Sequence, residues 1–258
     1  DVKGKNEAFQ TSSGKRKPLQ SDTKVGYPSR GGFQEIFRGF EKTNPNIILN
    51  SEVVSIDTNK KIAKIIDGTE YKYKTLISTI PLPILVRIIK GCDKHIIKEA
   101  DSLEYMSLRV AFLLVGKKLN SDVQRIYISN PEIYAHKIAL NHNSSDFLRK
   151  KNQSAIMAEV SLSDEKKINP DDIPSNTIDF LCKIGILESR EDVILEDFVD
   201  VKYAYPVYTH DRPRSVKLIK SWMKDRSIYT LGRFGEWEYI NSDKCIMKGI
   251  QLAKELNN

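Results

Sequence analysis

The stretch from Tyr229 to Asp243, which reads YTLGRFGEWEYINSD, constrains the fold more than any other part of the chain. It predicts a short apolar strand, a Gly-Arg turn, an aromatic loop and a capped helix that continues towards the C-terminus. Gly232 and Gly235 allow the backbone to approach a ligand closely, and the guanidinium of Arg233 has forked donors that suit phosphate. A helix that starts at 241–243 directs free N–H groups to the same place. These features are typical of a site for a polyanionic cofactor, although a tight turn with an ordinary helix cap would use the same residues.

A three-stranded antiparallel meander is predicted between residues 52 and 74. Its strands are Glu52–Asp57, Lys61–Ile66 and Glu70–Lys74, and the short segments between them have hairpin-turn composition. A helix precedes the meander, with Phe33, Ile36, Phe37 and Phe40 on one face, and Ile47–Leu49 is typical of a buried strand in a parallel sheet. After the meander, Thr75–Ile80 is predicted as an apolar strand that ends at Pro81, followed by a helix with Leu85, Ile88 and Ile89 on one side.

The middle of the chain favours an antiparallel sheet. Four successive strands with short connections are predicted, at Leu108–Val115, Gln124–Ser129, Ile133–Leu140 and Ala155–Leu162. The following elements are a helix around 175–185, a strand Phe198–Tyr205, a helix with Val216, Ile219, Trp222 and Met223 inward, a strand Ile228–Leu231 and a final helix with Ile246, Gly249, Ile250 and Ala253 as its apolar face.

These elements predict a mixed fold, α/β plus α+β. We expect a polar arm or loop at 1–24, an α/β body made of 25–90 and 225–258, and an inserted antiparallel-sheet domain at 91–224. The α/β body would be a partial Rossmann-like domain that contains the meander and the C-terminal helix.

Composition narrows the class of partner. The net charge of +7 comes from scattered lysines, which favours a solvated surface over a nucleic-acid interface. No apolar run approaches the length of a membrane span, and three widely separated cysteines predict neither a disulfide framework nor a CxxC site, which fits the cytoplasm. The four histidines lack HxH or HExxH spacing, so no metal site is predicted, and no GxSxG motif supports a serine nucleophile.

Four stretches of the chain occur in an order that resembles a known superfamily. They are YPSRGGF at Tyr27–Phe33, IILNSEVVSID at Ile47–Asp57, ISTIPLP at Ile77–Pro83 and GRFGEWEYINSD at Gly232–Asp243. The set resembles the flavin-containing amine oxidases, including protoporphyrinogen oxidase-like proteins and, at the last stretch, UDP-galactopyranose mutase-like proteins. Two departures stand out: the GxGxxG of the family is absent from this chain, and the "MD" of the mutase-like motif is Ser242-Asp243. We therefore expect a C-terminal fragment that lacks the N-terminal GxGxxG unit.

The resemblance implies FAD as the cofactor and suggests which residues hold it. By resemblance, Val53 packs on the adenine, Thr79 and Pro81 lie near the adenosine phosphate, Gly232 and Arg233 lie beside the pyrophosphate and ribityl chain, and Asn241, Ser242, Asp243 and Lys244 form the helix start that reaches the flavin pyrimidine. Tyr205, Trp237 and Tyr239 are candidates to line the flavin face, and no residue stands out as a general base.

Three functions remain open from the sequence. The first is an FAD-dependent oxidoreductase that moves a hydride from a small-molecule substrate to flavin N5. The second is a UDP-galactopyranose mutase-like isomerase, in which reduced flavin attacks a nucleotide-sugar and arginines hold the diphosphate. Arg109, Arg149, Arg212 and Arg214 could bind an anionic substrate, although each is equally typical of an ordinary surface arginine. The third is a flavin-less binding or scaffold protein, which the missing GxGxxG favours.

Overall fold

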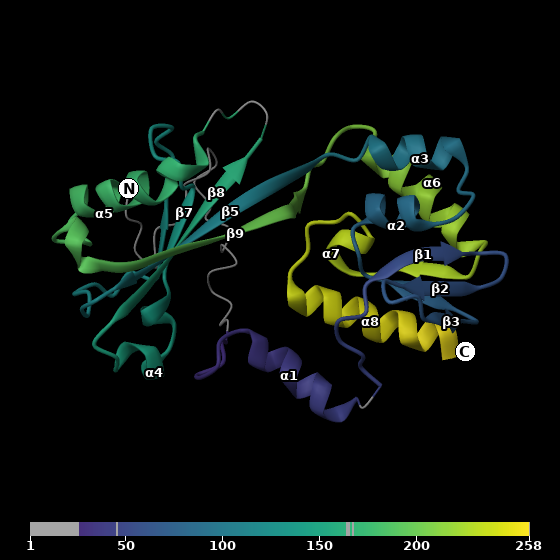
Figure 1. The fold of residues 1–258 in the computed structure, drawn as a ribbon, viewed down its shortest axis with the longest axis horizontal. Coiled ribbons are helices and arrows are strands. Elements are labelled where there is room, and N and C mark those ends of the chain that lie inside the picture. The colour runs from purple at the N-terminus through teal and green to yellow at the C-terminus, as the bar shows by residue number, and fades with distance from the viewer. Residues whose placement is uncertain (1–25, 45, 164–165, 167, 258) are drawn as a thin grey trace, which may run out of the picture. The chain divides into compact units, whose positions relative to one another are not determined.

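The computed structural model describes residues 26–44, 46–163, 166 and 168–257, and the chain divides into two compact units (Figure 1). Unit 1 comprises Asp1–Ile47 and Ser107–Val201, and unit 2 comprises Ile48–Met106 and Lys202–Asn258. The chain therefore crosses between the units within two strands, β5 (Tyr105–Val115) and β9 (Val193–Pro206). The expected division into 25–90 with 225–258 and an inserted 91–224 stays a prediction, and the two compact units place 26–47 with the middle of the chain. The expected polar arm at 1–24 lies outside the described residues.

Unit 1 is built on a five-stranded sheet with the order β6-β7-β8-β5-β9. The β5–β8 and β7–β8 pairs are antiparallel, which confirms the prediction for the middle of the chain. Alternate residues of β5 and β8 face the core, so Leu113 lies opposite Ile156 and both are buried. The remaining elements of unit 1 are β6 (Arg125–Tyr127), β7 (Lys137–Leu140), β8 (Ser154–Leu162), α1 (Gln34–Thr43), α4 (Asp146–Arg149) and α5 (Ile173–Lys183).

The segment before the meander contains the predicted helix but not the predicted strand. Helix α1 forms as predicted, but it has no buried residue, and the aromatic side chains of Phe33, which precedes it, and of Phe37 and Phe40 are all exposed. The predicted strand Ile47–Leu49 is wrong, because these three residues form no strand and their side chains are exposed. A short apolar run predicts a buried strand only where a neighbouring strand is present to pair with it.

Unit 2 contains the predicted meander and a small parallel sheet. Strands β1 (Val53–Asp57), β2 (Ile62–Ile65) and β3 (Glu70–Lys72) pair antiparallel in chain order. Strands β4 (Leu76–Ser78) and β10 (Ile228–Thr230) pair in parallel, although about half of the chain separates them. The helices of unit 2 are α2 (Leu82–Ile88), α3 (Lys94–Asp101), α6 (Arg212–Lys224), α7 (Gly232–Gly235) and α8 (Ser242–Asn257).

The core of unit 2 joins α2, α3, α6 and the two parallel strands. Leu82, Leu85, Ile219, Met223 and Trp237 are among its fully buried side chains. Burial of one such aliphatic side chain contributes roughly 1.5–3 kcal/mol relative to leaving it exposed. This core therefore holds the ends of β4 and β10 in a defined position.

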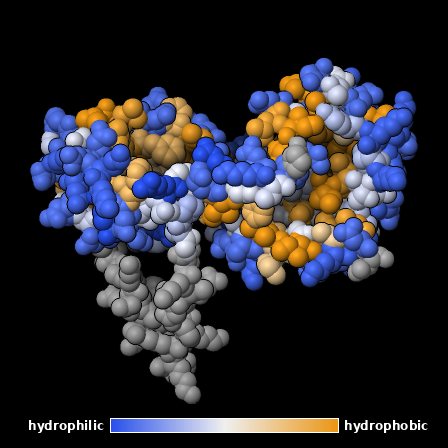
Figure 2. Space-filling view, turned by 90° about the horizontal axis from the view of Figure 1, so that it is seen from below, coloured by the Kyte–Doolittle hydropathy of each residue, from blue (hydrophilic) through white to orange (hydrophobic). Residues whose placement is uncertain are grey.

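Helix α8 departs from its predicted packing. The apolar face predicted for it is not buried, since no described residue of α8 is buried and Ile250 is 47% exposed. Figure 2 shows unit 2 as the right-hand body, with apolar side chains gathered on the visible face.

The helices and strands of the two units confirm the mixed α/β class. The Rossmann-like character of the α/β body stays a prediction.

Candidate functional site

The parallel pairing of β4 and β10 brings two predicted segments to one end of a sheet. Thr230 lies opposite Ser78, and the N–H of Leu231 donates to the carbonyl of Ser78 at 2.9 Å. Because the strands are parallel, the Thr79–Pro81 turn and the Gly232–Arg233 turn both follow the carboxyl ends of their strands. In α/β sheets, ligands bind outside these carboxyl ends. This end of the sheet is the candidate site, and we call it the strand-end corner.

The corner depends on a close approach between α7 and the end of β4. The sequence predicts a turn and a loop here, whereas the structure has a short helix that starts at Gly232, whose φ is +79°. A Cβ placed on Gly235 would lie 2.8 Å from the carbonyl oxygen of Ser78 and 3.4 Å from Cα of Thr79. Glycine at 235 is therefore required for backbone packing, and Thr79 lies directly beside α7.

The side chain of Arg233 contacts two aromatic rings at the strand-end corner. Its Nε donates to the carbonyl of Ile240 at 2.8 Å, and its guanidinium lies over the rings of Tyr239 and Tyr205, at 4.7 Å and 5.9 Å from their centroids. The rings of Tyr205 and Tyr239 are 5.5 Å apart. The structure records no protein acceptor, within the described ranges, for the two terminal amino groups of Arg233. These groups remain available to an anion.

Trp237 occupies a different environment from Tyr205 and Tyr239. Its side chain has no exposed surface and packs edge-on against Tyr105 and Tyr203 in the core of unit 2. Its φ of +52° is rare for a bulky residue and costs of order 1–3 kcal/mol, which the surrounding packing must supply. The structure thus places Trp237 beneath the corner, where it supports the loop.

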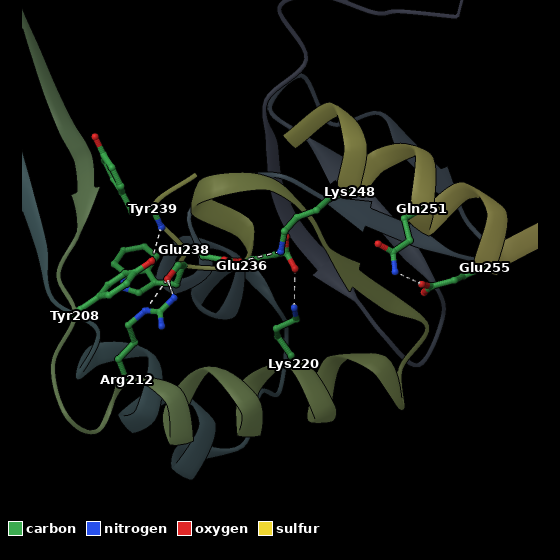
Figure 3. Close-up of polar contacts among 10 residues, drawn as sticks. Tyr208, Arg212, Lys220, Glu236, Glu238, Tyr239, Lys248, Gln251 and Glu255 are labelled. Atoms are coloured by element: carbon green, nitrogen blue, oxygen red, sulfur yellow. Dashed lines mark hydrogen bonds and ion pairs between the residues drawn. The ribbon is translucent and has the colours of Figure 1, made fainter. Parts of the chain in front are cut away.

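Two residues that the sequence did not single out as loop supports hold the 237–239 segment. Arg212 donates from Nε to the carbonyl of Trp237 at 2.7 Å, and its Nη2 donates to the same oxygen. The hydroxyl of Tyr208 accepts from the N–H of Tyr239 at 2.8 Å, and Arg212 stacks on the Tyr208 ring (Figure 3). No periodicity marks such loop contacts in a sequence, so only the fold reveals them.

The start of α8 completes the corner. Asn241 caps the helix with its carbonyl, which accepts from the N–H of Cys245 at 3.0 Å, and Asn241, Asp243 and Lys244 are exposed. The bond from Arg233 to Ile240 ties this helix start to α7. Ser242 is half-buried. The first turn of α8 therefore presents N–H groups next to Arg233, as an anion site requires.

Val53 and Pro81, also predicted as cofactor contacts, are both half-buried. Val53 begins β1, where it pairs with Ile65 and packs against the core of unit 2. Pro81 is the residue before α2, directly after the Thr79 turn. Pro81 therefore lies at the strand-end corner, whereas Val53 lies in the meander.

An ion-pair cluster braces the segment after α7. Glu236 accepts from Lys220 of α6 at 2.9 Å and pairs with Lys248 of α8 at 3.0 Å, and Lys248 also pairs with Glu238 at 2.8 Å (Figure 3). Burial by itself would raise the pKa of Glu236, but the two lysines outweigh it and lower the pKa below its usual value. Glu236 is therefore ionised at neutral pH and ties both helices to the loop.

The other arginines that the sequence offered for an anionic substrate have partners within the chain. Arg109 donates from two nitrogens to Asp200 at 2.7 Å, and Arg214 pairs with Glu99 at 3.0 Å. Arg149 donates to the carbonyl of Asn143 at 3.1 Å. No group of three metal-ligating side chains occurs in the described part of the chain, and none of its helices is long and apolar enough to cross a membrane.

Known structures share this fold. The chain resembles the reduced UDP-galactopyranose mutase with a TM-score of 0.82 and 23% identity, covering 89% of this chain and 51% of that one. It resembles a protoporphyrinogen oxidase-like protein from Exiguobacterium sp. (TM-score 0.64, 13% identity, 87% of this chain and 51% of that one). It also resembles a fatty acid isomerase from P. acnes that produces CLA (TM-score 0.66, 15% identity, 87% and 52%). The chain thus spans about half the length of the structures it matches.

The sequence itself matches a protein family across nearly its whole length. The sequence model of the flavin containing amine oxidoreductases matches residues 3–253, which include every part of the strand-end corner. The cofactor predicted from the sequence, FAD, is the cofactor type of that family. The chain belongs to the flavin-containing amine oxidoreductase family.

Proposed function

We propose that this chain forms the C-terminal part of the cofactor site of an FAD-dependent oxidoreductase. The observation that carries the proposal is the strand-end corner, where Thr79, Gly232, Arg233 and the start of α8 meet at the carboxyl ends of two parallel strands. When bound, FAD supplies a flavin ring that accepts a hydride from a small-molecule substrate. The family shows the cofactor type, and the reaction is our proposal.

The residues of the corner suit this cofactor for separate physical reasons. Gly235 lets α7 pack directly on the backbone of Ser78, and Gly232 carries no side chain at the start of α7, so a ligand phosphate could approach its backbone N–H. The guanidinium of Arg233 supplies a fixed positive charge with free donors. The first turn of α8 favours negative charge through its unpaired N–H groups. Together they would hold the pyrophosphate and the electron-rich edge of the flavin.

The tyrosine pair at the corner could pack against a ligand ring. Tyr205 and Tyr239 flank the guanidinium of Arg233, and Tyr239 is 55% exposed. A planar ring system could pack on these side chains and exclude water from one of its faces. Trp237 would act indirectly, because its buried ring fixes the course of the loop that carries Tyr239.

A mutase-like reaction on a nucleotide-sugar is the alternative. The observation that favours it is the Tyr205–Arg233–Tyr239 cluster, since a guanidinium that lies over two aromatic rings and keeps donors available suits a diphosphate. The sequence of the last stretch, GRFGEWEY, and the fold likeness to a UDP-galactopyranose mutase point the same way. In this alternative the two tyrosines would line the diphosphate of the substrate and would not pack on a planar ring.

The test measures flavin in the complete gene product. We expect the purified protein to carry FAD, detected by its visible absorbance and by its release on denaturation. Arg233→Ala should lower the flavin content by about tenfold or more, because a charged donor is lost at the phosphate site. Arg226→Ala is the matched control: its guanidinium stacks on Trp222 in the same unit and is expected to leave flavin content unchanged.

The outcomes separate the three readings of the sequence. A colourless protein that takes up no added FAD would refute both enzyme proposals and leave a binding or scaffold role. Anaerobic reduction of the bound flavin by an amine or a tetrapyrrole precursor selects the oxidoreductase. Turnover of a nucleotide-sugar only after chemical reduction of the flavin selects the mutase-like isomerase.

A further inference from the structure

A buried polar contact joins α3 to the first turn of α6, outside the strand-end corner. The hydroxyl of Ser215 donates to Oε2 of Glu99 at 2.6 Å, and Nη1 of Arg214 donates to Oε1 of Glu99 at 3.0 Å. Ser215 is 1% exposed and Glu99 is 6% exposed. The bond from Ser215 and the charge of Arg214 lower the pKa of Glu99, although burial alone would raise it. Glu99 is therefore an ionised carboxylate at neutral pH within a contact between two helices.

The first turn of α6 depends on this polar contact more than the rest of the helix does. The buried side chains of α6 follow one another by one turn along a single stripe: Ser215, Ile219 and Met223. The two apolar members hold the middle and the end of α6 in the core of unit 2. At the end of α6 away from Ser215, Nε1 of Trp222 donates to Oδ2 of Asp93, directly before α3, at 2.5 Å. The buried side chain of the first turn is Ser215, so the position of this turn depends on Glu99.

The same turn of α6 begins with Arg212, which contacts the loop of the strand-end corner. Nε of Arg212 donates to the carbonyl of Trp237 at 2.7 Å, and the guanidinium stacks on the ring of Tyr208 (Figure 3). The hydroxyl of Tyr208 in turn accepts from the N–H of Tyr239 at 2.8 Å. Because the backbone of Trp237 has a φ of +52°, the loop needs such contacts to keep its course. A continuous series of contacts therefore runs from Glu99, through the first turn of α6, to the loop that carries Tyr239.

We propose that Glu99 is a positioning residue of the strand-end corner, which holds Arg212 and, through it, the loop that carries Tyr239 in the conformation that receives the cofactor. This inference rests on the proposed cofactor role of the corner. Every contact in the series lies within unit 2 and joins two groups of this chain. A buried charged contact stabilises a protein no more than well-packed apolar side chains of similar volume do, but its directed bonds hold two helices in one arrangement. Positioning therefore accounts for a carboxylate and a hydroxyl where apolar side chains would pack equally well.

The decisive variant replaces the polar pair by an apolar pair in the complete gene product. Glu99→Leu/Ser215→Ala removes the buried charge together with its buried partner, so we expect a urea midpoint at or above that of the wild type. The loop should loosen nevertheless. Hydrogen exchange of the amides of Glu238 and Tyr239, both of which donate hydrogen bonds, should be about tenfold faster or more. A contact that served stability alone would leave this exchange unchanged in a variant of unchanged stability.

Two single variants accompany the double variant. Asp93→Ala is the matched control, because it removes the hydrogen bond at the other end of the same two helices and should leave the exchange of the loop at the wild-type rate. Ser215→Ala removes the hydroxyl alone and leaves Glu99 paired with Arg214. It should accelerate the exchange of the loop by about threefold or more, and it carries the test if the double variant does not fold.

Flavin binding is the second readout, and it separates this inference from the proposed function. The double variant should bind FAD with a Kd about tenfold higher or more and should change the visible circular dichroism of the bound flavin, whereas Asp93→Ala should match the wild type. A protein that takes up no FAD would refute the proposed function, and the exchange of the loop would still decide the role of Glu99. Wild-type exchange of Glu238 and Tyr239 in both Ser215 variants, or equal acceleration by Asp93→Ala, would overturn the inference even in a protein that carries FAD.

Discussion

The close approach of α7 to β4 makes Gly235→Ala a sharp test of the strand-end corner. A Cβ at this position would lie 2.8 Å from the carbonyl oxygen of Ser78, closer than such atoms approach in proteins, and the neighbouring atoms are backbone. The segment must therefore shift as a whole. Overpacking of this kind costs about 1–3 kcal/mol.

A second effect of the same substitution acts in the opposite direction. Replacing glycine by alanine within a helix stabilises by roughly 0.5–1 kcal/mol, because the unfolded chain loses fewer conformations. The clash is the larger effect, so we expect Gly235→Ala to lower the free energy of unfolding by about 1–2 kcal/mol. It should also lower flavin content, because the displaced α7 carries Gly232 and Arg233.

Gly249→Ala is the matched control in the same unit. A Cβ there would lie 3.7 Å from Leu231, an ordinary contact distance, so only the favourable helix effect remains. We expect stabilisation by roughly 0.5–1 kcal/mol. Urea unfolding followed by tryptophan fluorescence reports on unit 2, which contains both Trp222 and Trp237. If Gly235→Ala raised the urea midpoint as Gly249→Ala does, the proposed contact with Ser78 would be refuted.

Two further substitutions test the packing and the ion pairs of unit 2. Glu236→Gln should destabilise the protein by about 1–2 kcal/mol at pH 7, because the charged partner of Lys220 and Lys248 is lost. Burial favours the neutral form of Glu236, but the two lysines favour the charged form more strongly, so the folded pKa of Glu236 lies below the unfolded pKa of about 4.3. The contribution of Glu236 to the free energy of unfolding is therefore present above the unfolded pKa and is lost as the pH falls through the lower folded pKa. Urea midpoints of wild type and variant should therefore converge in acid, and a constant difference at all pH values would contradict the assignment. Leu85→Ala should cost about 2–5 kcal/mol because Leu85 is fully buried, and its control Ile77→Ala, at an exposed position, should cost less than about 0.5 kcal/mol; comparable losses would contradict the described core.

Local patterns predicted much of the secondary structure. The meander and the antiparallel sheet of unit 1 were predictable because alternation of apolar and polar residues directly reports a strand with one buried face. The predicted strand Ile47–Leu49 failed, and the apolar face of α8 is largely uncovered, because a pattern shows that a segment could be buried and not what covers it.

The strand-end corner shows where sequence reasoning ends. Its glycines, Arg233 and the start of α8 were visible in the sequence, since special backbone geometry and helix caps require particular residue types. Trp237 was predicted on the flavin face, and only the packing shows that its ring is buried against Tyr105 and Tyr203. A loop has no period, so its sequence does not tell which side chains turn inward.

The sequence by itself determined the family, the strand and helix types and the residue types of the candidate cofactor site. The tertiary structure alone decided that the Thr79 turn and the Gly232–Gly235 helix lie together, through the parallel register of β4 with β10. The physical reason is that pairing between strands distant in the chain depends on the packing of the whole core, which short-range patterns do not encode.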